Sequence, residues 1–522
     1  MSEGLGDRAV WCPAGFRWRN RGRPCCAAWF VEHINDNTAA VASIEDVADC
    51  TARADAQVRK VLGVVMAQRR SAAVAFDYVA ALAPGMKANC WWLAESAGHE
   101  GWGRMQALLG SYRWDWRQLR AQLPGLAAAW IPDADGDLIG PGIAIDETAQ
   151  LKHGDATACV APQHAGCTGQ VENCVTTVFS AYVTAKGHTW ADFDVYMPER
   201  WAGDPPRRGA ARIPGELEFA TKPQLAMNQL DRLIAAGLPV KWVAFDEVYG
   251  RSEKLRMACA RAGLGYVAII PCDYQITLPS GTVIQASQAV KDAVFERRSC
   301  GNGSKGPRYS DWAMTATAIP GQYLLIRRLI SRPEQLTFCL CWAPDGTPAT
   351  MTYFITIAGR RWPAEETFKT GKDVYGWDQC QARTFDGICR HTALAALAQL
   401  RCLAIRGALR GEIRLPATAT QAGYDSSTAI DDGDISGTDL QIPLGDAPLP
   451  VRGGQPCPPG IAPIKLSVAE TAWLARLAVQ YTAGLISRAR LGFALRWSAR
   501  RRRHQATARW HHYSARLLAA TG

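Results

Sequence analysis

The chain has 522 residues, of which 48% are hydrophobic and 20% are charged. This length predicts two to four structural units, and the apolar content is sufficient for buried cores. No apolar stretch is long enough to predict a membrane span, and the N-terminus lacks the charged and apolar regions of a secretory signal. The 17 cysteines form no CxxC pair, so reduced thiols in a bacterial cytoplasm are expected rather than a disulfide framework or a zinc site.

The net charge of +10 is concentrated near the C-terminus. Residues 471–522 contain ten arginines and no acidic residue. A concentrated basic segment is typical of a protein with a polyanionic partner, although a solvated surface helix is the alternative. We therefore expect a polyanion, such as double-stranded DNA, to contact the consecutive arginines Arg500, Arg501, Arg502 and Arg503.

The N-terminal part of the chain divides into two stretches. Residues 1–60 show no clear periodicity and are expected to form a poorly defined arm. Apolar residues then recur at spacings of three and four, with Pro and Gly between the segments. Residues 61–135 are therefore predicted to be a small helical domain, which could bind DNA.

Residues 140–410 show an α/β pattern. GIAID (142–146), VKWVAFD (240–246) and GYVAII (265–270) are typical of buried strands, and further strand-like runs occur around 156–160, 174–186 and 192–197. Helices are predicted at 222–237 and 251–263. Strands that alternate with helices predict an α/β unit with a mixed sheet.

Within this unit, residues 271–357 contain several strand-like runs, including TMTYFITIA near their end, and are predicted to be a β-rich insertion. Helices follow from about residue 361 and over 391–409. Residues 416–460 hold six aspartates and many Pro and Gly residues, which predicts a linker. Basic helices are expected over 464–522.

Three acidic residues occupy positions at which they could converge. Asp146 and Asp246 end predicted strands, and Glu365 lies in the first turns of the helix after the insertion. Neighbouring carboxylates repel one another, and a hard divalent cation is the usual remedy. The sequence therefore predicts a catalytic site in which all three bind two Mg²⁺ or Mn²⁺ ions for an attack on a phosphodiester. Glu247 and Glu366 adjoin two of these residues and are the alternatives.

Two basic residues accompany the third carboxylate. Arg361 precedes Glu365 by four positions and Lys372 follows it by seven, so a helix would place all three on roughly one face. We expect Arg361 and Lys372 to hold DNA phosphates, although an ordinary Arg–Glu helix pair is the alternative. Lys222, Arg207 and Arg208 could also touch DNA. Trp362 could stack on a displaced base, or could belong to the core.

The spacing of Arg361, Glu365 and Lys372 resembles the signature of insertion-sequence transposases related to family four. The chain is most similar to the insertion sequence 701 family, in segments that run in order from about residue 65 to 515. These include KANCWWLAESAGHEGWGRMQALLGSYRWD, IAIDETAQLKHG, VAFDEVYG, RRWPAEETF and RWSARRRRHQATA. The related signature has a Tyr three residues before the Arg, where this chain has Ala358.

The resemblance implies an RNase H-like catalytic core, interrupted by a β-strand insertion, with Asp146, Asp246 and Glu365 as its catalytic residues. It implies a transposase that acts on the terminal inverted repeats and on target DNA, as a homodimer when two ends are paired. A metal-dependent nuclease or resolvase on the same fold, and a non-catalytic DNA-binding descendant, are the alternatives. The expected location is cytoplasmic and nucleoid-associated, with no membrane contact.

Overall fold

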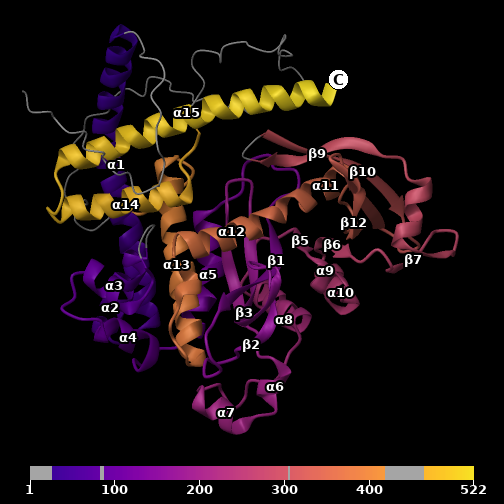
Figure 1. The fold of residues 1–522 in the computed structure, drawn as a ribbon, viewed down its shortest axis with the longest axis horizontal. Helices are drawn as coiled ribbons and strands as arrows, with labels where there is room; N and C mark the ends of the chain where they lie inside the picture. The colour runs from indigo at the N-terminus through magenta and orange to yellow at the C-terminus, as the bar shows by residue number, and fades with distance from the viewer. Residues whose placement is uncertain (1–25, 83–86, 304–305, 418–463, 522) are drawn as a thin grey trace, which may run out of the picture.

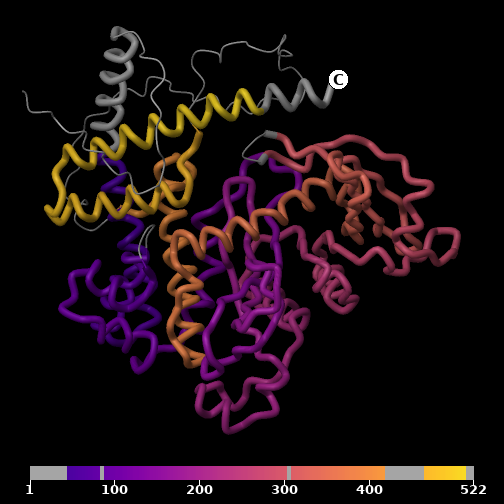
Figure 2. Tube along the Cα trace, in the orientation of Figure 1, coloured from indigo at the N-terminus to yellow at the C-terminus, as the bar shows by residue number. Residues whose placement is uncertain are grey.

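The computed structural model describes residues 26–82, 87–303, 306–417 and 464–521, which Figure 1 draws as a coloured ribbon. Figure 2 follows the course of the chain in the same orientation, from indigo at the N-terminal helices to yellow at the C-terminal helices. Residues 1–25 of the expected N-terminal arm lie outside this part of the chain. So does the expected acidic linker from residue 418 onward.

The centre of the protein is a ten-stranded mixed sheet with the order β2-β3-β1-β5-β6-β12-β11-β10-β9, in which β4 also pairs with β3 (Figure 1). β1, β5 and β6 are parallel, whereas the other neighbours are antiparallel. Together with the flanking helices, this arrangement is consistent with the predicted RNase H-like core. The strands are β1 (Gly142–Leu151), β2 (Ala161–Ala165), β3 (Gln170–Val183), β4 (His188–Val195), β5 (Trp242–Phe245), β6 (Gly265–Ile270), β9 (Glu296–Gly303), β10 (Gly306–Ala316), β11 (Gln322–Leu329) and β12 (Arg332–Trp342).

The central strands are buried on both faces. Ile143 and Ile145 of β1 belong to the large apolar cluster that includes residues of the helix α13 (Phe385–Leu409). Ala144 belongs to the cluster that includes residues of the helix α11 (Met351–Arg360). This is the alternation expected of a strand whose successive side chains point to opposite faces. The strand predicted around 156–160 is wrong, because the chain forms a turn there and pairs only from Ala161 onward.

The predicted insertion contributes strands β9 to β12 to the same sheet, and a small hairpin of β7 (Gln275–Thr277) and β8 (Val283–Gln285) beside it. Its predicted last strand is wrong: the helix α11 spans Met351–Arg360. The β-branched residues of this segment suggested a strand, but Thr350 caps a helix by accepting a hydrogen bond from the Tyr353 amide. Phe354 and Ile357, three positions apart, are both buried on the sheet side.

The remaining helices of the catalytic region cover the sheet or its ends. α8 packs against β3 and β4, α10 packs against β6, and α12 follows α11 and contacts β1 and β4. These helices and the short ones between them are α6 (Glu199–Ala202), α7 (Pro205–Ala210), α8 (Lys222–Ala235), α9 (Glu247–Gly250), α10 (Glu253–Arg261), η1 (Ala286–Asp292), α12 (Trp362–Asp373), η2 (Trp377–Gln379) and α13 (Phe385–Leu409).

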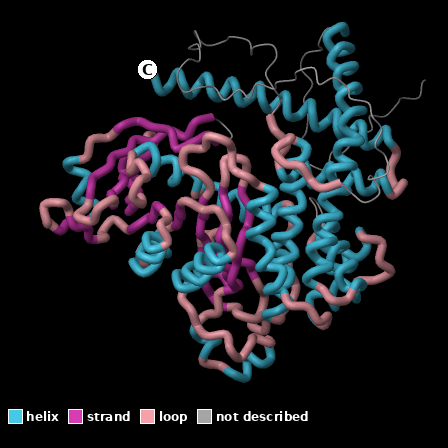
Figure 3. Tube along the Cα trace, turned by 180° about the vertical axis from the view of Figure 1, so that it is seen from behind, coloured by secondary structure: helices cyan, strands magenta, loops and turns pink. Residues whose placement is uncertain are grey.

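The N-terminal helices are α1 (Cys26–Val65), α2 (Arg69–Ala81), α3 (Cys90–Ser96), α4 (Gly103–Gly110) and α5 (Trp116–Trp130). They gather beside α13, on one side of the sheet region (Figure 3). The predicted arm over 1–60 is wrong for its second half, because α1 continues through residue 60 and buries Val47 and Ala54. The helical spacing of the apolar residues in α1 is hard to recognise in the sequence, because many of the residues around the buried positions are small or polar.

The helix α13 is the one described helix that is long and apolar enough to cross a membrane, and 83% of that stretch is buried inside the protein. It packs against α1, α2, α5 and α14. Its apolar surface is therefore used by the helices around it.

Two helices end the described chain, α14 (Val468–Thr482) and α15 (Arg488–Thr521). Both pack against α1, where Leu474 and Leu491 meet Ile44 and Val47 in a separate apolar cluster. α15 then extends across the molecule and contacts β10 of the insertion (Figure 1).

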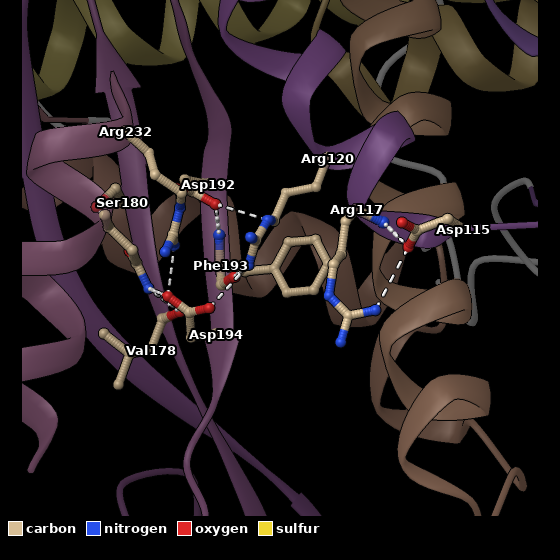
Figure 4. Close-up of polar contacts among 10 residues, drawn as sticks. Asp115, Arg117, Arg120, Val178, Ser180, Asp192, Phe193, Asp194 and Arg232 are labelled. Carbon is tan, nitrogen blue, oxygen red and sulfur yellow. Dashed lines mark hydrogen bonds and ion pairs between the residues drawn. The ribbon is translucent and has the colours of Figure 1, made fainter. Parts of the chain in front are cut away.

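A buried ionic network attaches the N-terminal helices to the sheet (Figure 4). Arg120 of α5 donates to Asp194 of β4 at 2.8 Å, and Arg232 of α8 pairs with Asp192 and Asp194. Burial raises the pKa of Asp192, while both arginines oppose that rise. Because removal of one partner would leave a buried charge uncompensated, this network fixes α5 and α8 relative to β4.

Candidate active site

Asp146 and Asp246 lie side by side on parallel strands. Ile145 of β1 is in register with Phe245 of β5, and each aspartate follows its apolar neighbour directly. β5 ends there as predicted, but β1 continues to Leu151 because it stays paired with β3. The two carboxylates therefore meet where β1 extends beyond the end of its parallel neighbour.

The pKa values of both aspartates are raised. Burial raises the pKa of Asp146 to about 7, and the neighbouring Asp246 carboxylate adds to the rise. Burial also raises the pKa of Asp246, followed by the charge of Glu147. Asp246 caps α9 and accepts a hydrogen bond from the Val248 amide at 3.0 Å, which orients its side chain. The site thus concentrates negative charge in a place that water reaches poorly.

Arg361 links the third acidic residue to this pair. Its guanidinium donates to Asp146 Oδ2 at 3.2 Å and to Glu365 Oε1 at 3.1 Å. The contact with Glu365 is the Arg–Glu helix pair that the sequence offered as the alternative to a phosphate contact, whereas the contact with Asp146 was not predicted. Arg361 is only 21% exposed, so its charge acts mainly on these carboxylates.

The neighbouring acids of the predicted triad have other partners. Glu366 lies 3.5 Å from His188 Nε2, and the hydrogen bond from His188 lowers its pKa. Glu247 pairs with Arg251 at 2.5 Å. Neither contact involves Arg361, which pairs with Glu365 instead.

Glu147 is a member of the site that the sequence reasoning missed. Its carboxylate accepts from Lys222 Nζ at 2.6 Å and from the buried Tyr249 hydroxyl. Tyr249 belongs to α9, the helix that Asp246 caps, so Glu147 connects β1 to the segment that positions Asp246. The adjacent acidic pair in IAIDET was visible in the sequence, but its partners are 75 and 102 residues away.

Other residues predicted to touch DNA differ in their surroundings. Lys222 is paired with Glu147, which argues against its use as a DNA contact. Arg208 also has partners within the protein, because it donates hydrogen bonds to the carbonyls of Pro214 and Leu217 and stabilises the loop that contains them. Lys372 lies half-buried on α12.

The structure also bears on the alternatives for Trp362 on α12 and for Arg207 on α7. The core alternative for Trp362 is wrong, since 48% of this residue is exposed. Arg207 lies over the Trp201 ring at 3.8 Å and donates to the Asp155 carbonyl, so it has a structural role in this arrangement.

The C-terminal arginine run does not form one continuous basic face. Arg502 donates to the Ile464 carbonyl, and Arg501 pairs with the buried Glu470 at 3.4 Å. Arg500 is exposed. Contact of all four arginines with DNA stays a prediction, with Arg501 and Arg502 already in contact with other residues of the chain because successive helical residues point in different directions.

The acidic residues fit a hard divalent cation in their chemistry. Asp146, Asp246 and Glu365 offer carboxylate oxygens, the ligands that Mg²⁺ and Mn²⁺ prefer. A cation would offset the burial and the repulsion from Asp246 that together raise the pKa of Asp146. Within the described residues no three Asp, Glu, His or Cys side chains group closely enough to hold a metal ion as they stand. Arg361, in contact with Asp146 and Glu365, provides the compensating charge in this arrangement.

Comparisons with known proteins agree with this arrangement. Residues 61–309 match a family model described as DDE superfamily endonuclease, and residues 221–401 match one described as transposase DDE domain. The probable transposase for insertion sequence element IS701 of Microchaete diplosiphon is 27% identical over 243 residues. That similarity covers 45% of this chain and 57% of the relative, so the chain spans little more than half of the relative's length. The first model covers Asp146 and Asp246, and the second covers Asp246 and Glu365.

Proposed function

Since this chain belongs to the DDE transposases, of the insertion sequence 701 type, we propose that it binds the terminal inverted repeats of an insertion sequence. It cleaves the DNA there and joins the ends to target DNA. The proposal includes Asp146, Asp246 and Glu365 as the catalytic residues. Pairing of two ends would require two copies of the chain, so a homodimer on DNA is part of it.

One observation carries the proposal. Asp146 and Asp246 meet at the end of β5, and Arg361 connects Asp146 to Glu365. The three acids come from segments about 100 residues apart, and two of them share a guanidinium that can attract a phosphate. A non-catalytic DNA-binding descendant would not need this arrangement, and this favours an active enzyme.

Asp146, Asp246 and Glu365 would hold two Mg²⁺ or Mn²⁺ ions. When bound, such ions activate a water or a 3′-hydroxyl and stabilise the leaving oxygen of a phosphodiester. The chain itself orients the ligands: Arg361 holds Asp146 and Glu365, and the hydrogen bonds of Asp246 to α9 fix its carboxylate. Glu147, held by Lys222 and Tyr249, supports the same strand end.

The positive charge of the chain would hold the DNA. Among the described residues, Arg500 on α15 and Lys372 on α12 form no ion pair, and phosphate contacts need such available cations. α15 lies on the side of the molecule that faces the insertion, since it contacts β10. Arg361 would contact the phosphate nearest the carboxylates.

The test is cleavage of DNA that carries the ends of the element, with Mg²⁺ or Mn²⁺ and with EDTA. Asp146→Asn, Asp246→Asn and Glu365→Gln should each reduce the cleavage rate by about 10³-fold or more while DNA binding persists, because catalytic groups act as a unit. Glu366→Gln is the matched control and should cleave normally, since Glu366 pairs with His188. Normal cleavage by Glu365→Gln would contradict the assignment.

The alternative of a nuclease or resolvase predicts the same cleavage results. A strand-transfer assay separates the two functions, because only a transposase joins the cleaved 3′ ends to a target duplex. Cleavage without any joined product would favour the nuclease.

A further inference from the structure

A small cavity beside the carboxylates is lined by three arginines and by no acidic residue. Its volume is about 90 Å³, and Arg308, Arg327 and Arg361 contribute to its wall with Thr337, Cys339 and Trp362. Arg361 also contacts Asp146 and Glu365, so the cavity adjoins the catalytic site. We call it the arginine cavity.

The strands of the insertion direct these side chains inward. Arg327 of β11 is in register with Thr337 of β12 and with Trp312 of β10, and Thr337 and Trp312 also line the cavity. Arg328, the next residue, pairs with Asp311 instead, as expected for the opposite face of the strand. The alternation of β11 therefore places one arginine in the cavity and the next one away from it.

Two of the three guanidiniums lack an anionic partner. Among the described residues, neither Arg308 nor Arg327 forms an ion pair, and the Nε atom of each is buried without a hydrogen-bond partner. Arg308 donates to the Cys300 carbonyl at 3.4 Å and to the Gly359 carbonyl at 3.1 Å, and its guanidinium lies 5.7 Å from the centre of the Trp362 ring. Besides the hydrogen bond from His188, its charge also lowers the pKa of Glu366, although Arg308 and Glu366 form no ion pair. Arg327 donates to the Thr337 hydroxyl at 3.3 Å. Buried donors without partners are costly, and an anion between them would satisfy both.

The size and position of the cavity limit the ligand. Pockets that take small organic ligands usually measure about 300–1,000 Å³, so a cavity of about 90 Å³ suits a single compact group. Three guanidiniums favour a tetrahedral oxyanion with several acceptors. Trp362 lines the cavity and is 48% exposed, so this part of the wall extends to the protein surface.

We propose that the arginine cavity is a subsite for one backbone phosphate of the DNA strand that lies at the catalytic carboxylates. This inference rests on the proposed function and deepens it, since it names how the β-rich insertion takes part. Arg308 and Arg327 bind the phosphate, while Arg361 lies between that phosphate and Asp146. The insertion thereby positions the strand without reading its sequence.

The experiment is a double-mutant cycle between protein and DNA, measured as binding in EDTA so that no cleavage occurs. Single phosphates near the cleavage position are replaced in turn by uncharged methylphosphonates. In the wild-type protein one replacement should weaken binding roughly tenfold or more, as expected for loss of a charged hydrogen bond. In Arg308→Gln/Arg327→Gln the same replacement should have less than about a twofold effect.

Arg328→Gln is the matched control, because it removes the same charge from the neighbouring residue on the opposite face of β11. It should leave the methylphosphonate pattern unchanged. Far-UV circular dichroism checks that the variants fold. If the double variant does not fold, Arg327→Gln alone is used, and the effect of that one replacement should at least halve.

Three results would overturn the inference. The first is an unchanged methylphosphonate pattern in the arginine variants, and the second is the same change in Arg328→Gln. The third is competition by inorganic phosphate without any methylphosphonate effect, which would assign the cavity to a free anion. Cleavage by the wild-type protein is measured separately: coupling without cleavage refutes only the proposed function, and cleavage without coupling refutes only the phosphate subsite.

Discussion

The arginines of α15 and those of the arginine cavity show opposite relations between sequence and space. In α15 four arginines are consecutive, but Arg502 turns toward the Ile464 carbonyl and Arg501 pairs with Glu470. In the cavity, Arg308, Arg327 and Arg361 are 19 and 34 positions apart and still line one volume. A dense run of charge is therefore a poor guide to where charge is concentrated in the folded protein.

The difference has a simple geometric origin. Successive residues of a helix are about 100° apart, so four neighbours cover the whole circumference. Strands and a helix that meet at one place can instead bring side chains together from anywhere in the chain. The cavity is also less exposed than α15, so its charges are less screened by salt.

Among the basic residues, the largest effect is expected at Arg361. Arg361→Gln removes a charge that contacts both Asp146 and Glu365, and the cleavage rate should fall by about 10²–10³-fold, the usual cost of one lost electrostatic contact at an active site. Arg361→Lys should recover part of the rate, because it keeps the charge but loses the second donor. Single-turnover cleavage kinetics provide the measurement. A cleavage rate of Arg361→Gln within threefold of wild type would show that Arg361 does not contribute to catalysis through Asp146 and Glu365.

A second prediction extends the contrast between buried and exposed groups to histidine. Burial lowers the pKa of His391 to about 4, and its ring lies between the Tyr78 hydroxyl at 2.8 Å and the Trp377 carbonyl at 3.1 Å. Below about pH 6.5 the histidine of the unfolded chain binds a proton, whereas His391 of the folded chain stays neutral until about pH 4. The free energy of unfolding is therefore highest above pH 6.5 and decreases as the pH falls toward 4. Between pH 6.5 and pH 4 this histidine should lower the free energy of unfolding by about 3 kcal/mol.

The measurement is urea unfolding between pH 4 and 8, in the wild-type protein and in His391→Gln. The variant should be less stable at pH 8, and its free energy of unfolding should vary less with pH between 4 and 6.5. Parallel curves for the two proteins would refute the role of this histidine.

The third prediction compares two neighbours in α15. Arg500→Ser should reduce the salt dependence of log K for DNA by roughly 0.9, because an exposed arginine can release one counterion on binding. Arg502→Ser should leave that slope nearly unchanged and destabilise the protein by about 1 kcal/mol, since Arg502 donates to the Ile464 carbonyl. DNA titrations at several salt concentrations, with thermal unfolding, distinguish the two. Equal slope changes would mean that α15 rearranges on DNA.

The smallest effect is expected at Lys222. Lys222→Met should change the same salt slope by less than about 0.3, because Glu147 already neutralises this charge and a DNA phosphate would have to displace it. Arg500→Ser in the same titration series is the positive control. A slope change near 0.9 would restore Lys222 as a phosphate contact.

Much of the core was predictable from local patterns. The strands at 142, 242 and 265 carry continuous apolar runs, which are typical of parallel strands buried on both faces. The prediction of a strand over residues 351–357 was wrong because β-branched residues fit a strand equally well. The Thr350 cap and the packing on the sheet make this segment the helix α11. The beginning of α1 was missed because its buried positions lie among small and polar residues, and a helix of that kind depends on its neighbours.

The sequence by itself determined the residue types and local spacings of the proposed site: two acids after apolar runs, and an Arg four positions before a Glu on a helix. Only the tertiary structure decided that Glu147 joins the site through Lys222 and Tyr249, and that Glu366 turns to His188. It also decided that Arg308 and Arg327 meet Arg361 around one cavity. The physical reason is that local spacing sets the direction of a side chain on its own helix or strand, whereas its partners depend on which distant elements pack there.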